Sequence, residues 1–113
     1  MIEIIILNAL EDALDVPVYM EVPEDKPESY VLLEKTGSQR VDRIDMATFA
    51  VKSIAATLLG AATLNESVKA AMEQLPQLTE EIFAAKLNSD YNFTDTKTKE
   101  RRYQAVYNIT YKE

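Results

Sequence analysis

The chain has 113 residues, 47% of them hydrophobic and 27% charged, and its formal net charge is -7. These values are ordinary for a folded protein with one core, so we expect a single domain over residues 1–113. Cysteine and histidine are both absent, which excludes disulfides, the usual zinc ligands, thiol nucleophiles and Ser-His-Asp catalysis. The acidic balance argues against a dedicated nucleic-acid-binding protein, because such binding depends on neutralising phosphates.

Neither apolar segment of the chain has the features of a membrane span or a leader. The longest apolar run, "SIAATLLGAATL", is too short and too rich in alanine to cross a bilayer. The N-terminal "MIEIIILNAL" lacks the basic residues that precede the apolar part of a signal peptide. We therefore expect a soluble intracellular protein with no membrane partner.

The first half of the chain predicts a helix followed by short strands. Apolar residues at helical spacing indicate an amphipathic helix over residues 2–14, which must end before Pro17. The segment "VPVYMEVP" predicts a short strand that its prolines restrict to an edge or to strand ends. After a proline-bearing acidic loop, residues 30–36 predict a strand, and residues 37–43 predict a long turn with basic residues near its tip.

The second half alternates between strand and helix periods. Residues 44–53 predict the second strand of a hairpin, and residues 55–75 carry a helical stripe that Pro76 ends. Two more strands are predicted over residues 81–93 and 102–111. The order indicates a two-layer α+β fold, in which a four- to five-stranded, mostly antiparallel or mixed sheet packs against one long helix plus the N-terminal helix.

Three tyrosines fall on one face of the last predicted strand. Tyr103, Tyr107 and Tyr111 recur at every fourth residue, with Ala105 and Ile109 between them, and side chains of a strand alternate between the two faces of its sheet. Such a ladder could stack the bases of a single nucleic-acid strand. Aromatic residues on alternate strand positions are more often the core side of a sheet that a helix covers. We expect the core arrangement, with Tyr103 and Tyr107 buried.

Basic residues of this acidic chain gather on two predicted loops. They are Arg40 and Arg43 on the first loop, and Lys97, Lys99, Arg101 and Arg102 on the second. Because the long helix must run back along the sheet, we expect loops 37–43 and 92–101 to project from opposite ends rather than to form one patch. Two interpretations remain open: contacts with the acidic surface of another copy, which would be head-to-tail, or solvated tips that protect the sheet edges.

Carboxylates supply the remaining candidate sites. The N-terminal third is acidic, with Glu11, Asp12 and Asp15 followed by further carboxylates in the proline-bearing loop. A hard cation such as Mg²⁺ needs only oxygen ligands, yet none of these residues has the spacing of an ion-binding loop. Asp90 and Asp95 near two arginines suggest phosphate chemistry, but no glycine-rich loop accompanies them. We interpret both groups as solvated surface and loop electrostatics.

Three stretches, taken in order, resemble the small tail terminator, or tail completion, proteins of long-tailed bacteriophages and prophages, a family of minor tail proteins. They are "DVPVYMEVPEDKPESYVLLEKTGSQ", "MATFAVKSIAATLLGAATLNESVKAAMEQL" and "SDYNFTDTKTKERRYQAVYNITY". The shared features are a proline-bounded segment before "YVLLEKTG", a strand that runs into an alanine-rich helix, and a closing strand begun by an Arg-Tyr pair. The resemblance covers nearly the whole chain.

The resemblance implies a structural protein rather than an enzyme, with no cofactor. Members form a ring, usually of six subunits, at the head-proximal end of the tail tube, where the ring stops tube polymerisation and serves head–tail joining. The implied partners are further copies of the chain, the tail tube protein and the head–tail connector protein. The implied location is the host bacterial cytoplasm during assembly and then the virion tail. On this reading Arg40, Arg43, Lys97, Lys99, Arg101 and Arg102 make the subunit, tube or connector contacts.

Two other classes of function stay open at this stage. One is another ring component of the head–tail junction, such as a stopper or connector protein. The other is a small carboxylate-metal-dependent enzyme that uses Asp90, Asp95 or the acidic N-terminal segment.

The absence of a cofactor gives a direct prediction. Because no metal is expected to contribute to folding, the calorimetric melting temperature should be the same with and without EDTA. A midpoint several degrees lower in the chelator would contradict this expectation and would favour the metal-dependent alternative.

Overall fold

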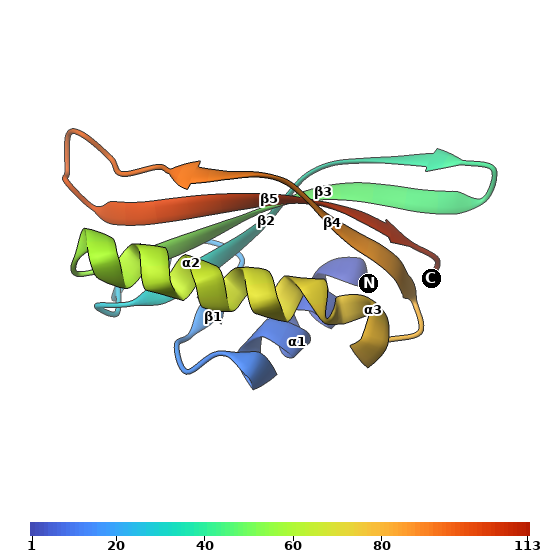
Figure 1. The fold of residues 1–113 in the computed structure, drawn as a ribbon, viewed down its shortest axis with the longest axis horizontal. Helices are drawn as coiled ribbons and strands as arrows, with labels where there is room; N and C mark the ends of the chain where they lie inside the picture. The colour runs from blue at the N-terminus through green and yellow to red at the C-terminus, as the bar shows by residue number, and fades with distance from the viewer.

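A computed structural model of residues 1–113 shows an α+β fold, in which three helices lie on one face of a five-stranded sheet (Figure 1). The elements are α1 (Ile2–Ala13), β1 (Val18–Tyr19), β2 (Tyr30–Val41), β3 (Ile44–Ala55), α2 (Leu58–Glu73), α3 (Leu75–Leu78), β4 (Ile82–Asn92) and β5 (Arg101–Tyr111). The strands lie in the order β1-β2-β3-β5-β4. Only β1 and β2 pair in parallel, and all other neighbours are antiparallel. The predicted fold class is confirmed.

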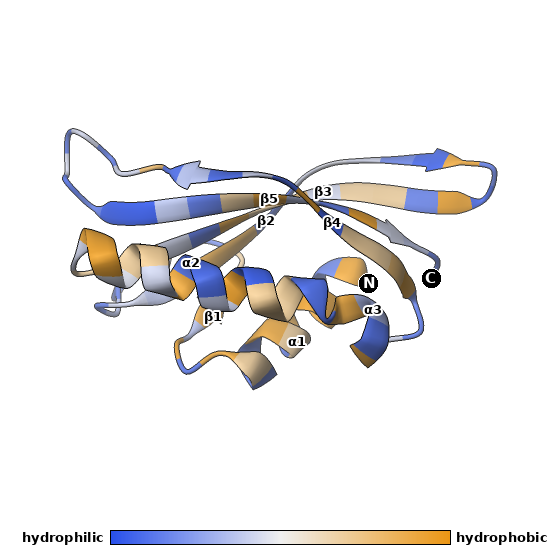
Figure 2. Ribbon diagram, viewed as in Figure 1, coloured by the Kyte–Doolittle hydropathy of each residue, from blue (hydrophilic) through white to orange (hydrophobic).

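The core lies between the helices and the sheet. Alternate residues of β3 and β5 point towards the helices, so that Phe49 and Tyr107 meet Val68 and Met72 of α2 in one buried cluster. The helix α1 adds Ile2, Ile6 and Leu10 to the same cluster. Figure 2 shows apolar segments on the helices beneath the sheet, while polar segments lie towards both hairpin ends. Each fully buried large apolar side chain contributes about 1.5–3 kcal/mol, which makes this layer the main source of stability.

The long helix begins later than its apolar stripe suggests. Thr57 caps α2, because its side chain accepts a hydrogen bond from the Gly60 amide at 3.0 Å. A Cβ atom at Gly60 would lie 3.0 Å from Thr57 Oγ1 and 3.2 Å from the Ala55 Cβ, so glycine allows the close approach there. At its other end α2 stops before Gln74, which separates it from the short α3, and Pro76 lies in the first turn of α3.

Two sequence-based boundaries are wrong. The expected turn over residues 37–43 is strand: β2 continues to Val41, and only Asp42 and Arg43 form the turn. Both have positive φ, 52° and 68°, as in the two-residue turns whose twist matches that of hairpin strands. Gly37 is not a turn residue but follows a bulge at Thr36. The expected strand 16–23 is only the two-residue β1, because the proline at position 17 has no N–H to extend a ladder.

The two long hairpins project from opposite ends of the sheet, as expected from the sequence (Figure 1). The register places Val41 opposite Ile44 at one end, and Ala55 opposite Arg101 at the other. The β2–β3 hairpin extends beyond the helical layer, whereas the β4–β5 connection lies above the start of α2 (Figure 1), and the molecule measures 43 × 25 × 24 Å. Contacts made at the two hairpin ends are therefore separated by the length of the domain.

Tyr107 and Tyr111 are buried in the core, so the base-stacking interpretation is wrong for these two residues. The Tyr107 hydroxyl donates a hydrogen bond to the Glu73 carboxylate at 2.8 Å. Burial, together with this carboxylate, raises the pKa of Tyr107. Tyr103 is only half-buried, against expectation. It pairs with Ser53 and Asn92 towards the end of the sheet that carries the β4–β5 connection.

Replacing Tyr107 tests the packing of the sheet on α2. Tyr107→Ala should lower the free energy of unfolding by about 3–5 kcal/mol, because it removes a large buried side chain. Tyr107→Phe keeps the ring and loses only the hydroxyl, with its hydrogen bond to Glu73 and a longer contact to the Lys69 carbonyl, so its cost should be about 0.5–1.5 kcal/mol. Urea unfolding measures both values. A loss below about 1 kcal/mol for the alanine variant, which is typical of surface positions, would contradict the core assignment.

Candidate functional site

The β2–β3 hairpin ends in a small apolar tip, which we define as residues 41–44. Val41 and Ile44 are exposed and face each other across the Asp42–Arg43 turn. Just below the tip, Arg40 donates two hydrogen bonds to the Asp45 carboxylate, at 2.7 and 3.2 Å. This bidentate pair lowers the pKa of Asp45. Arg43 forms no ion pair within the chain, so the turn itself leaves one basic side chain for a partner.

The connection between β4 and β5 is a structured basic loop, which we define as residues 93–101. Asp95 organises it: its carboxylate accepts hydrogen bonds from the amides of Lys97 at 2.8 Å and Thr98 at 3.3 Å. These two bonds hold the pKa of Asp95 below its ordinary value. The Lys99 amide donates to the Asp95 carbonyl at 2.7 Å, and Lys99 has a φ of 59°. Since the pKa is depressed, this stabilisation is present above the ordinary carboxyl pKa and is lost as the pH falls through the depressed value.

Arg102 holds the base of the basic loop. Its Nε donates to the Phe93 carbonyl at 2.7 Å, and its guanidinium lies 4.8 Å from the centre of the Phe93 ring. The same guanidinium pairs with Glu100 at 3.2 Å and with Asp95 at 3.7 Å. Glu100 in turn accepts a hydrogen bond from the buried Tyr30 at 3.4 Å. Arg102 is thus part of the architecture of the loop.

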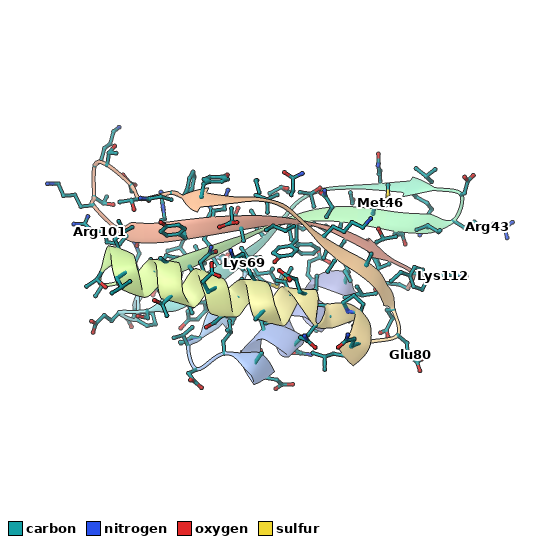
Figure 3. All side chains as sticks on the ribbon, in the orientation of Figure 1. Arg43, Met46, Lys69, Glu80, Arg101 and Lys112 are labelled. Carbon is teal, nitrogen blue, oxygen red and sulfur yellow. The ribbon has the colours of Figure 1, made fainter.

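The six predicted contact residues therefore divide into three groups. Arg40 and Arg102 are engaged within the chain. Arg43 stands at one end of the sheet, and Lys97, Lys99 and Arg101 stand at the other, without ion pairs within the chain. Figure 3 shows Arg43 and Arg101 at opposite ends of the molecule. The structure does not bring the basic residues into one patch, and it offers two separate surfaces of different chemistry.

The carboxylates do not converge. No group of three or more aspartate or glutamate side chains is placed to hold a metal ion. Asp90 lies 3.3 Å from the Asn65 amide and 3.4 Å from Lys69, while Asp95 is occupied by the basic loop. The carboxylate-metal alternative therefore has no assembled site to support it.

No helix is both long and apolar enough to cross a membrane.

Two features escaped the sequence-based reasoning. The apolar tip was hidden because the "GSQRVDR" segment has the composition of a loop. The second feature is the free edge of β4, where Phe83 and Leu87 are 53% and 41% exposed. Strand alternation did predict β4, but which strand lies at an edge depends on the spatial order of the sheet.

No protein-family model and no curated protein matches this sequence.

The division between engaged and available arginines can be tested on neighbouring residues. Arg102→Gln should make the amides of the basic loop exchange with solvent about tenfold faster, because the loop loses its hydrogen bond to Phe93 and two ion pairs. Arg101→Gln is the matched control, and it should leave amide exchange in the loop nearly unchanged. Hydrogen–deuterium exchange measures both. Equal effects of the two substitutions would show that Arg102 has no special role in ordering the loop.

Proposed function

We propose that this chain is a structural ring component of a bacteriophage tail, the terminator that caps the head-proximal end of the tail tube. The observation that carries the proposal is the pair of different contact surfaces at opposite ends of one elongated domain. One surface is the apolar tip with Arg43, and the other is the basic loop with Lys97, Lys99 and Arg101. The resemblance of three sequence stretches to tail terminators supports the same assignment.

A protein that stops a polymer needs two unlike faces. One face must bind the last tube subunits, while the other must not offer the surface that would recruit the next tube ring. A ring of subunits with the apolar tip on one side and the basic loop on the other would have such faces. The basic loop, with three cations and no ion pair to Lys97, Lys99 or Arg101, suits an acidic partner surface.

The proposed partners are further copies of the chain in a ring of six, the tail tube protein and the head–tail connector protein. The proposed location is the host cytoplasm during assembly and then the virion tail. A stopper or connector protein of the head–tail junction is the competing assignment, and it differs in its binding partner. A terminator binds the ends of tubes, whereas a stopper binds filled heads.

The proposal is tested by neutralising the basic loop. Lys97→Gln, Lys99→Gln and Arg101→Gln together change the formal net charge from -7 to -10, while Arg102 and its ion pairs are kept. We expect the variant to fold, since the three side chains lie on an exposed loop, yet to lose the capping of tail tubes. Electron microscopy of tubes assembled with the variant should show excess length and few tails joined to heads.

A matched control changes the charge equally on another surface. Ser67→Glu, Ala70→Glu and Gln74→Glu add three negative charges to exposed positions on and just after α2, which also gives -10. This control should still cap tubes at normal length. If the loop variant also caps tubes and joins heads normally, the basic loop is only a solvated tip. Binding of the parent protein to filled heads rather than to tube ends would favour the stopper assignment.

A further inference from the structure

The sheet has two long free edges, one on each side. On one side β4 pairs only with β5. On the other, β1 covers β2 only at Val31 and Leu32, so the outer edge of β2 is unpaired from Leu33 to Val41. Unpaired backbone N–H and C=O groups on an edge form a template for pairing with another strand.

We infer that copies of this chain join edge to edge, with β4 of one subunit pairing antiparallel with the outer edge of β2 in the next. The inference deepens the proposed function and rests on it for the closed ring. Strand direction supports this occupant: β2 is antiparallel to β3, β3 to β5 and β5 to β4, so β2 and β4 run in opposite directions. Copies related by rotation about an axis along the strands would meet in the antiparallel sense, with all helices on the same side.

The two edges also match in height along the strands. Lys86 pairs with Asn108, Asn108 with Thr48, and Thr48 with Gly37, so Lys86 and Gly37 are level on opposite edges. Bulges interrupt β4 between Ile82 and Ala84 and again between Leu87 and Ser89. They leave residues 84–87 regular, and residues 84–86 are level with residues 37–39 of β2, while Leu87 is level with Lys35 across the bulge at Thr36. The bulges also confine pairing to a short stretch, which limits open-ended aggregation.

Side chains on these edges suit a second copy. Leu87 shares the helix-covered face with its pairing partner Tyr107, and a neighbouring strand would cover the 41% of it that is exposed. On the open face, the exposed Lys86 has no ion pair within the chain and is level with Gly37, so no like charge would lie directly opposite it. Glu34, on the same face of the β2 edge, already pairs with Lys52 at 2.9 Å. Over the length of β4 only Lys86 and Asp90 are charged, so little repulsion opposes contact.

Edge pairing would also give the two hairpin ends separate roles. With the strands along the ring axis, the edges make the contacts within the ring. The apolar tip and the basic loop then point along the axis in opposite directions, because they lie at opposite ends of the sheet (Figure 3). Neither hairpin end is needed for contacts between neighbours in the ring, and both stay available for the tube and the connector.

Cross-linking tests the pairing directly, because the natural chain has no cysteine. A Lys86→Cys variant is mixed with a Gly37→Cys or a Gln39→Cys variant at high concentration and treated with a short bismaleimide. Gly37 tolerates a side chain, since nothing lies within 4 Å of a Cβ built there. Gln39 lies two residues further along the same face of β2, so its variant would detect a pairing register shifted by two residues. We expect about tenfold more mixed dimer than for Lys86→Cys with Ser67→Cys on α2, because paired edges give a high effective concentration.

A second pair of variants removes dependence on cross-linking chemistry. Leu87→Lys places a charge on the β4 edge and should abolish the oligomer seen by sedimentation, while circular dichroism shows a folded chain. Leu59→Lys on α2 changes a leucine that is 79% exposed and should leave the oligomer intact. A chain that stays monomeric throughout, or an oligomer that cross-links no better than the α2 control and survives Leu87→Lys, would overturn the inference. The capping assay is separate: cross-linked edges without capping would leave edge pairing standing and defeat the proposed function.

Discussion

The packing of α2 against the middle of the sheet is the interaction on which the rest of the structure depends. Phe49 of β3 and Tyr107 of β5 pair directly and meet Val68 and Met72 of α2. This contact fixes β3 and β5 as the central strands, because only they lie under the helix along its length. Their partners β2 and β4 must then lie outside them, which leaves the sheet with two free edges and with one hairpin, β2–β3, that extends beyond the helical layer.

The hairpin ends differ because they are ordered by different means. At the apolar tip, a two-residue turn with left-handed backbone at Asp42 and Arg43 suffices, and the Arg40–Asp45 pair ties the two strands just below it. The basic loop is longer and bends around polar groups, with Asp95 accepting loop amides and Arg102 bonding across its base. The apolar tip therefore exposes Val41, Ile44 and one cation, Arg43, whereas the basic loop exposes several cations on a hydrogen-bonded frame.

Much of the fold could be predicted from residue periodicity, and the errors have local physical causes. The helices α1 and α2 and the four long strands follow from apolar spacing, but the short α3 around Pro76 was not predicted. The end of β2 was also missed, because Gly37 and Ser38 have the composition of a turn while their backbone is extended. The sequence located the six basic residues near the two connections, but it could not tell which of them make ion pairs within the chain and which do not. Arg101 and Arg102 are adjacent in sequence, and only the position of Phe93 and Glu100 makes one structural and leaves the other without an ion pair.

By itself, the sequence determined an α+β fold without thiol or imidazole side chains, with six of its twelve basic residues in or beside two hairpin connections. Those properties depend on residue type and on spacing along the chain. Tertiary structure alone decided that β2 and β4 carry the free edges, and that those edges run antiparallel. These properties depend on which strands become neighbours, and strand order is set by packing under α2 between residues far apart in sequence.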